Sequence, residues 1–154
     1  HPFTTCGLLR ELKRQRVKPK VIVGLTSSSS METLTGCAKE AEGIIIPTSF
    51  APVNKEARYA ASEAAKLGGA MDLHSAAAWE NVMVIADVIE KSGALGKPDT
   101  LQADRGKIRD ELASRKTTKG LLGTIGRTAE GEAEKPFVYA VARGGQWEVL
   151  HDPS

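Results

Sequence analysis

The chain has 154 residues, of which 41% are hydrophobic and 26% charged, a composition that suits one globular domain and excludes a collagen-like, coiled-coil or disordered chain. Its 21 Lys and Arg against 19 Asp and Glu leave a formal net charge of +2. Because nucleic-acid binding requires a surface that neutralises many phosphates, we expect no nucleic-acid partner.

Short apolar runs and scattered cysteines and histidines exclude further classes of protein. The longest apolar runs, residues 43–46 and 82–86, are far shorter than the roughly 20 residues that cross a bilayer. Cys6 and Cys37 form no Cys-x-x-Cys motif and the histidines share no ligand spacing, so we predict no metal site and no cofactor. Whether the two cysteines pair stays open, and two free buried thiols are the simpler interpretation.

The first part of the chain alternates helix and strand. Helical spacing of apolar residues predicts a helix over residues 7–17. Residues 20–24 (KVIVG) are apolar on both faces, which predicts a central parallel strand covered on both sides. The polar loop 25–30 then leads to a predicted helix over residues 31–41.

A second strand and two helices follow. Residues 43–46 predict a buried strand, and Asn54 can cap a helix that reaches residue 67. The strongest helical pattern covers residues 75–90, where Val82 and Ile85 belong to a broad apolar side. We expect this helix to be well buried.

The last part of the chain turns to antiparallel strands. After a weaker amphipathic helix over residues 101–114, residues 120–125 predict one short strand. Residues 137–141 and 147–150 flank a Gly-Gly pair, which predicts an antiparallel hairpin. The elements together predict an α/β fold with a parallel sheet and a terminal antiparallel hairpin.

Four segments occur in the order typical of one known family: LLRELKRQRVKPKVIVG, AKEAEGIIIPTSF, AAAWENVMVIADVIEKSGAL and TTKGLLGTIGRTAEGEAEKPFVYAVARGGQWEVL. Nearly the whole chain resembles the C-terminal half of a periplasmic solute-binding protein of the branched-chain amino acid (Leu/Ile/Val-binding, type I) family, the receptor component of ABC importers. In the last segment Arg127 and Thr128 replace the family's Phe-Asp pair and Glu132 stands for its final Asp. The positions that match the family's glycine-rich pattern there are Gly120, Gly123, Ile125 and Gly131.

The resemblance implies a division of the chain between two lobes. Residues 1–50 belong to the second lobe, the helices of residues 51–118 pack on the first lobe, and residues 119–154 return to the second. Family members are much longer, so the chain resembles a fragment without the first lobe's sheet. Whether the start at His1 is proteolytic, engineered or natural stays open.

Such a fragment leaves the apolar side of the helix over residues 75–90 without the sheet that it would cover. Large exposed apolar patches usually find a partner. We therefore predict self-association of the fragment, by exchange of elements between copies.

The polar loop 25–30 is the first candidate ligand site. Ligands of open α/β sheets bind beyond the carboxyl ends of the strands, and this loop follows such an end. We expect Thr26, Ser27 and Ser28 to contact a ligand, because their hydroxyls can both donate and accept hydrogen bonds. The alternative is a flexible connector in which a later serine caps the next helix.

Thr26 also bears on the class of solute. By the resemblance, receptors for amino acids carry an acidic residue at this position to meet the ligand's ammonium group. A neutral threonine cannot replace that charge-assisted hydrogen bond. The expected solute is therefore an aromatic or aliphatic carboxylate without an ammonium group.

Three ring side chains complete the candidate ligand site. Phe3 falls in an expected loop that faces the cleft, unless the terminus is disordered. Phe50 follows the second strand at a lobe crossing, where it contacts ligand or only forms the hinge. His74 precedes the long helix, where the alternative is a surface or capping residue. We expect Trp79 and Trp147 to be packing anchors.

These features predict a receptor and not an enzyme. No identifiable base or nucleophile is paired by motif, and GLTSSSS lacks the P-loop pattern and its lysine. The resemblance implies a periplasmic location, a small-molecule solute and a membrane permease of an ABC importer as partner. Two alternatives stay open, a ligand-sensing domain of the same fold in a signalling protein and a receptor for branched-chain amino acids themselves.

Overall fold

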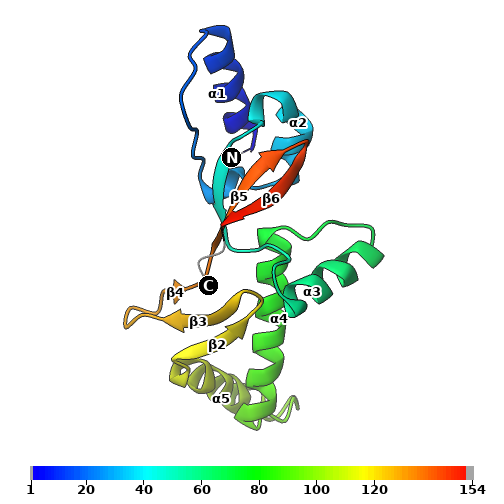
Figure 1. The fold of residues 1–154 in the computed structure, drawn as a ribbon. Helices are drawn as coiled ribbons and strands as arrows, with labels where there is room; N and C mark the ends of the chain where they lie inside the picture. Colours follow the sequence, from blue (N-terminus) through cyan, green and yellow to red (C-terminus); the bar gives the residue numbers. More distant parts are fainter. Residues whose placement is uncertain (1, 152–154) are drawn as a thin grey trace.

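A computed structural model describes residues 2–151, which form two units joined by two chain crossings (Figure 1). His1 lies outside the described residues. The upper unit contains α1 (Pro2–Arg14), η1 (Thr26–Ser28), α2 (Met31–Ala41), β1 (Ile45–Thr48), β5 (Val138–Arg143) and β6 (Gln146–His151). The lower unit contains α3 (Lys55–Lys66), α4 (Leu73–Ser92), α5 (Leu101–Ser114), β2 (Thr117–Gly120), β3 (Gly123–Arg127) and β4 (Ala133–Glu134).

The sheet of the upper unit combines antiparallel strands with one parallel neighbour. β5 lies between β1 and β6, and both pairs are antiparallel. An extended segment joins β1 in parallel, since Ile45 N donates to Ile22 O at 3.0 Å and Gly24 N donates to Ile45 O at 2.8 Å. The expected terminal hairpin is confirmed as β5 and β6.

The strand expected over residues 20–24 differs from its prediction. It pairs through a single bridge at Val23, and it lies at the edge of the described sheet instead of its centre. Val21 and Val23 are each 60% exposed, and only Ile22 packs against the core. This bridge is the parallel pairing that the described residues contain. No further strand among them lies beyond the segment of Val23, so this segment is the edge of the sheet next to β1.

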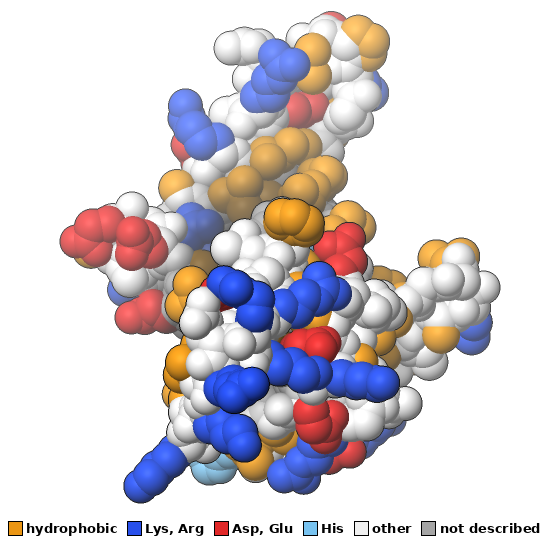
Figure 2. All heavy atoms as spheres, turned by 90° about the horizontal axis from the view of Figure 1, so that it is seen from above, with side chains coloured by type: hydrophobic (Ala, Val, Ile, Leu, Met, Phe, Trp, Pro, Cys, Tyr) orange, Lys and Arg blue, Asp and Glu red, His pale blue; other side chains and the backbone are white. Residues whose placement is uncertain are grey.

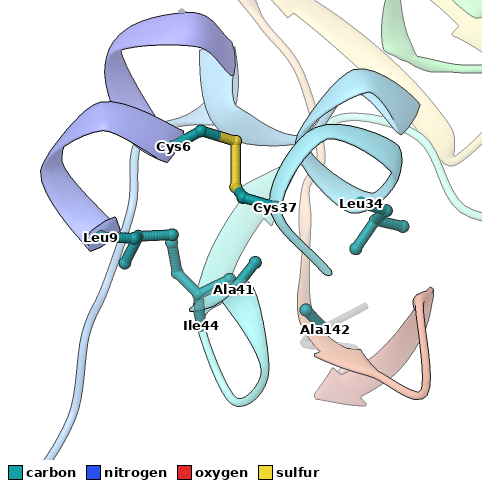
Figure 3. Packing of buried hydrophobic residues seen from close by; sticks show 7 residues of the cluster. All are labelled: Cys6, Leu9, Leu34, Cys37, Ala41, Ile44 and Ala142. Atoms are coloured by element: carbon teal, nitrogen blue, oxygen red, sulfur yellow. A yellow bond between two sulfur atoms is a disulfide. The ribbon is translucent and has the colours of Figure 1, made fainter. Parts of the chain in front are cut away.

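The core of the upper unit lies between α1, α2 and one face of the sheet (Figure 3). Leu9, Leu34 and Ala142 come from the two helices and from β5, and all three are buried. Cys6 and Cys37 lie in the same cluster and form a disulfide, with their sulfur atoms 2.02 Å apart. The interpretation as free thiols was therefore wrong, because pairing depends on how α1 packs against α2.

The helix boundaries agree closely with prediction except in α1. Pro2 occupies the first position of α1, where its missing N–H costs nothing, so the helix starts earlier than expected. Phe3 is consequently helical and 87% exposed, and the prediction that it lies in a loop is wrong. Asn54 caps α3 as predicted, since its Oδ1 accepts from Ala57 N at 2.8 Å.

The strand expected over residues 120–125 is a hairpin. β2 pairs with β3 in antiparallel fashion, and Leu121 and Leu122 form the turn between them. Both leucines are buried, because Leu121 packs with Phe50 and Leu122 packs with Val138. Hairpin turns are usually marked by Gly, Asn or Asp, so this apolar turn resembled a continuous strand.

The apolar side of α4 is largely uncovered. Val82 is 66% exposed, Met83 58%, Ile85 49% and Ile89 44%, whereas Val88 is buried. The prediction that this helix is well buried is therefore wrong for the described residues. α5 and the small sheet of the lower unit pack on other sides of the helix (Figure 1).

Basic side chains gather on the end of the upper unit that carries α1 (Figure 2). Lys13 pairs with Glu40 at 3.1 Å and Arg14 with Glu11 at 2.7 Å. Such exposed pairs contribute little to stability because water and salt screen them. None of the helices in the described residues is long and apolar enough to span a bilayer.

Candidate ligand-binding site

A cavity of about 520 Å³ lies where the upper and lower units meet, and we call it the inter-unit cavity. Pockets of roughly 300–1,000 Å³ with mainly apolar walls are typical of small-molecule sites. The upper unit contributes the start of α2 and the sheet, and the lower unit contributes the start of α4. The lining residues are Ser29, Met31, Ile46, Thr48, Phe50, Ala51, Pro52, Met71, Asp72, Leu73, Ala140, Gln146, Trp147 and Val149.

The first chain crossing forms one wall of this cavity. Thr48 Oγ1 donates to Phe50 O at 3.2 Å and accepts from Phe50 N at 3.4 Å, which fixes the chain as it leaves β1. Phe50 is only 7% exposed and also packs with Ala57 and Leu121 in the core of the lower unit. Phe50 therefore belongs both to the cavity wall and to the lower unit's core.

The serine-rich loop is folded into the short helix η1. Ser28 is buried, and its Oγ lies 2.8 Å from Thr5 Oγ1 in a hydrogen bond with α1. Thr26 is half-buried and Ser27 is exposed. None of these three residues lines the inter-unit cavity, but Ser29, which follows them directly, does.

The start of α4 brings Asp72 to the cavity. Its Oδ1 accepts from His74 N at 3.0 Å, Ser75 N at 2.8 Å and Ser75 Oγ at 2.8 Å, which makes Asp72 the N-cap of the helix. Partial burial raises the pKa of Asp72, but the hydrogen bonds from Ser75 and the proximity of His74 together lower it below its ordinary value. The side chain is therefore an ionised carboxylate at neutral pH.

Of the six predicted ligand residues, only Phe50 lines the inter-unit cavity. His74 is exposed and contributes its backbone N–H to the cap of α4. Phe3 is exposed on α1. The structure thus brings Phe50 to the cavity together with the direct neighbours of two other candidates, Ser29 next to Ser28 and Leu73 next to His74.

Solved structures show what the chain resembles, while no protein-family model and no curated protein matches it in sequence. A leucine-binding protein from Thermotoga maritima superposes with a TM-score of 0.78 at 20% identity, over 99% of this chain and 43% of that one. An extracellular ligand-binding receptor from Rhodopseudomonas palustris gives 0.74 at 15% identity, over 89% and 42%. A branched-chain amino acid transporter substrate-binding protein from Streptococcus pneumoniae, in complex with isoleucine, gives 0.71 at 21% identity, over 96% and 42%.

The chain has the fold of a type I periplasmic binding protein. At these identities the likeness establishes the fold alone, and at that level it confirms the resemblance to branched-chain amino acid receptors. The chain spans 43% of the length of the Thermotoga maritima protein. The three structures named above are described as a leucine-binding protein, an extracellular ligand-binding receptor and a transporter substrate-binding protein.

Within this type I fold, sequence reasoning missed the polar residues of the cavity. Asp72 had a recognisable signal, because an acidic residue three positions before Ser75 is a helix N-terminus pattern. Trp147 packs against the upper core as expected, but it also lines the cavity. The described residues contain no cluster of three His, Cys, Asp or Glu side chains that could hold a metal ion.

Proposed function

We propose that the chain is part of an extracellular solute-binding receptor of an ABC importer. The observation that carries this proposal is the apolar cavity of about 520 Å³ at the meeting of two units that are joined by chain crossings. The type I fold supports it. The proposed partners are a small organic solute and a membrane permease.

Solute capture would act through closure of the two units. A solute in the inter-unit cavity touches Trp147 of the upper unit and Leu73 of the lower unit, so it gains its full set of contacts only when both walls close on it. Binding then shifts the population toward the closed form by the difference in affinity between the two forms. No covalent step is needed.

The first proposed solute class is an organic carboxylate with an aromatic or aliphatic body. Met31, Phe50, Leu73 and Val149 give the cavity a mainly apolar lining, which suits such a body. Thr26 stands where the resembled amino-acid receptors carry an acid, but it does not line the cavity, so it supports this class only through the resemblance.

A second solute class, branched-chain amino acids, is favoured by Asp72. This ionised carboxylate lines the cavity, and a negative charge there attracts an ammonium group. Its Oδ1 is already hydrogen-bonded at the α4 cap, whereas no hydrogen bond within the described residues engages Oδ2. Asp72 could therefore accept a charge-assisted hydrogen bond from the ammonium group of an amino acid, which the neutral Thr26 cannot do.

Calorimetry on the full-length receptor separates the two solute classes. The panel contains leucine, 4-methylpentanoate, which is leucine without its ammonium group, and phenylacetate. If the receptor binds organic acids, both acids give a heat of binding and leucine gives none. Tight leucine binding with both acids inert would exclude the first solute class, and no binding across a broader solute panel would contradict the receptor proposal.

The variant Asp72→Asn tests the amino-acid alternative directly. Asn is as good an N-cap as Asp, so we expect stability to be nearly unchanged. If the solute is an amino acid, loss of the charge weakens leucine binding by about tenfold or more, the factor that corresponds to one charge-assisted hydrogen bond. If the solute is an organic acid, removal of a negative charge leaves its affinity equal or higher.

The disulfide supports export of the receptor. Disulfides persist in the periplasm and outside the cell and are rare in the reducing cytosol. Cys6 and Cys37 are both buried and bonded to each other. We therefore propose a periplasmic location.

The exposed side of α4 is proposed to pack on another lobe of the full-length receptor. Val82, Met83, Ile85 and Ile89 form an apolar stripe that nothing covers among the described residues. In this proposal the lower unit belongs with the first lobe and the upper unit with the second, so the chain returns to the second lobe at β5 and not at residue 119. The matched structures, which are more than twice as long, have room for such a lobe.

A further inference from the structure

Positive charge is concentrated at one end of the upper unit, although the charges of the whole chain are nearly balanced (Figure 2). Residues 10–20 (RELKRQRVKPK) contain six Lys or Arg and one acid, Glu11. Glu11 pairs with Arg14 at 2.7 Å, so it neutralises one of these cations. The segment runs from the last turns of α1 into the connection that leads to the edge segment of the sheet.

The cations surround a second hollow of the upper unit, of about 560 Å³, which we call the basic groove. Its cationic side chains come from the end of α1, from the connection that follows and from α2, and they are Lys13, Arg16, Lys18 and Lys39. The apolar part of its lining includes Leu12, Val17 and Ile22. The groove thus combines positive charge with an apolar floor.

Most of this positive charge is not neutralised within the described part of the chain. The acid in the lining, Glu40, pairs with Lys13 at 3.1 Å. Arg16, Lys18 and Lys39 are exposed, and no ion pair or side-chain hydrogen bond among the described residues engages them. Like charges that gather without counter-charges repel one another, so the cluster favours an anionic partner.

The backbone of Arg16 gives an independent observation. Its φ of 56° lies in the left-handed region, and among the described residues other than glycine it alone has a positive φ. The position ends α1, since Arg16 N donates to Lys13 O at 3.1 Å and Val17 N donates to Leu12 O at 2.9 Å. Glycine is the usual residue at such a position because it has no Cβ to strain this conformation. Arg16 instead adds a cation to the groove despite the local strain.

The shape of the groove favours one kind of anionic partner. A small inorganic anion would leave the apolar floor without a contact, and a flat membrane surface would touch the rim without entering the hollow. An extended acidic protein segment can place carboxylates at the rim and an apolar side chain on the floor. Val17 is 51% exposed in the groove, so it is open to such a side chain.

We propose that the basic groove binds an acidic segment of a partner protein, with an apolar side chain between the carboxylates. The groove shares no lining residue with the inter-unit cavity, so this inference does not depend on the solute. A partner bound here leaves the inter-unit cavity open. Solute binding therefore serves, with the unfolding temperature, as a control for correct folding.

Calorimetry on the full-length receptor at low ionic strength tests the proposal with the peptide Glu-Asp-Leu-Asp-Glu. Its affinity should fall as salt is added, because salt screens exposed charges. Gln-Asn-Leu-Asn-Gln lacks the charges and Glu-Asp-Gly-Asp-Glu lacks the apolar side chain. Both analogues should bind about tenfold more weakly or worse.

Three variants separate the groove from general charge effects. Lys18→Glu with Lys39→Glu should weaken peptide binding by about tenfold or more, because two attractive charges become repulsive. Lys55→Glu with Lys97→Glu changes the net charge equally at exposed positions outside the groove, so it should bind the peptide nearly as the wild type does. Arg16→Gly should weaken binding about threefold and keep or raise the unfolding temperature, since glycine suits the left-handed backbone.

The outcomes that overturn the proposal are distinct. Equal peptide affinities of the wild type and the Lys18–Lys39 double variant would exclude the groove and leave the receptor function standing. Binding to phosphatidylglycerol vesicles through the same lysines, without binding of the peptide, would assign the groove to a membrane surface instead. A double variant of lowered unfolding temperature, together with a wild type that binds no peptide, would show that the receptor's own chain fills the groove.

Discussion

Asp104 is a buried carboxylate that holds the loop between α4 and α5. Its Oδ2 accepts from Thr100 Oγ1 at 2.7 Å, Gly96 N at 3.0 Å and Leu95 N at 3.1 Å. The hydrogen bond from Thr100 lowers the pKa of Asp104, and with those from Leu95 and Gly96 it outweighs the opposing effect of burial. A single side chain therefore satisfies three donors of an otherwise irregular loop.

The lowered pKa gives the protein an acid-sensitive stability. A carboxylate whose pKa is lower in the folded state stabilises the fold fully above its unfolded value of about 3.9, and this contribution is lost as the pH falls through the folded value. We expect the urea midpoint of the wild type to fall steeply below about pH 4. Asp104→Asn should lower the midpoint at pH 7 and flatten its acid dependence. Asp99→Asn, at an exposed position, serves as control, and an Asp104→Asn protein with the wild-type acid dependence would contradict the assignment.

The candidate site was only partly predictable at the level of residues. Phe50 lines the cavity because it follows β1 at a crossing between the units, and its contact with a ligand stays a prediction. Thr26, Ser27 and Ser28 were placed by the same position after a strand, but η1 turns Ser28 toward Thr5 and leaves Ser29 as the cavity residue. A shift of one position depends on the local turn, which sequence periodicity does not determine.

Among the elements, Glu80 joins α4 to the small sheet and to the second crossing. Its Oε1 accepts from Leu121 N at 2.7 Å, and its Oε2 pairs with Lys135 Nζ. Glu80 is 6% exposed, so the charge is kept from water. The helix therefore holds both the β2–β3 turn and the chain that returns to β5.

Removing the cation should cost more than removing the acid. Lys135→Met leaves the Glu80 carboxylate buried and unpaired, so we expect a loss of about 3 kcal/mol in the free energy of unfolding. Glu80→Gln keeps an acceptor for Leu121 N and should cost less. Lys119→Met is the matched control, because Lys119 is 81% exposed in its pair with Glu56 and should change stability little. Urea unfolding at neutral pH measures all three variants. Equal losses in the free energy of unfolding for Lys135→Met and Lys119→Met would contradict a stabilising role of the buried Glu80–Lys135 pair.

The disulfide holds α1 and α2 of the upper unit together, as the Glu80–Lys135 pair holds elements of the lower unit together. Cys6 and Cys37 are 31 residues apart in sequence, and closing a loop of that length is expected to stabilise the fold by about 3 to 4 kcal/mol in the chain-entropy model. Reductant, or the double change Cys6→Ser and Cys37→Ser, should lower the urea midpoint accordingly. The double variant itself should not respond to reductant. A wild type whose midpoint is the same with and without reductant would contradict this role.

Helices were predicted more closely than strand pairing. The spacing of apolar residues within α2, α3 and α5 is local, and their ends matched within a residue. Pairing within the sheets depends on distant segments, so the edge position of Val23 and the turn at Leu121 were not foreseen. The disulfide belongs to the same class, since it follows from helix packing and not from cysteine spacing.

For the whole molecule, two apolar surfaces stand out on different units. One is the α4 stripe with Val82 and Ile85, and the other is the edge segment with Val21 and Val23. The apolar pattern of the sequence predicted that both surfaces are buried. This prediction is reasonable, because apolar patterning reflects burial in the full-length protein. The chain spans 43% of a matched receptor, so the covering elements are proposed to lie in the remaining lobe.

The uncovered α4 stripe leads to a prediction for the 154-residue chain studied alone. Exposed apolar surface of this kind drives association, so light scattering should show an apparent mass that rises with concentration. Met83→Lys with Ile85→Lys should reduce the association, because two charges resist burial between copies. Leu67→Lys, at a 91% exposed position on the C-cap of α3, should leave it unchanged. In the full-length receptor the same lysine pair should lower stability instead, since there the stripe is proposed to be covered by the other lobe. Two results together would contradict this proposal: a chain that stays monomeric at every concentration, and a receptor whose stability is unchanged by the lysine pair. They would show that this side of α4 is exposed to solvent in the full-length protein as well.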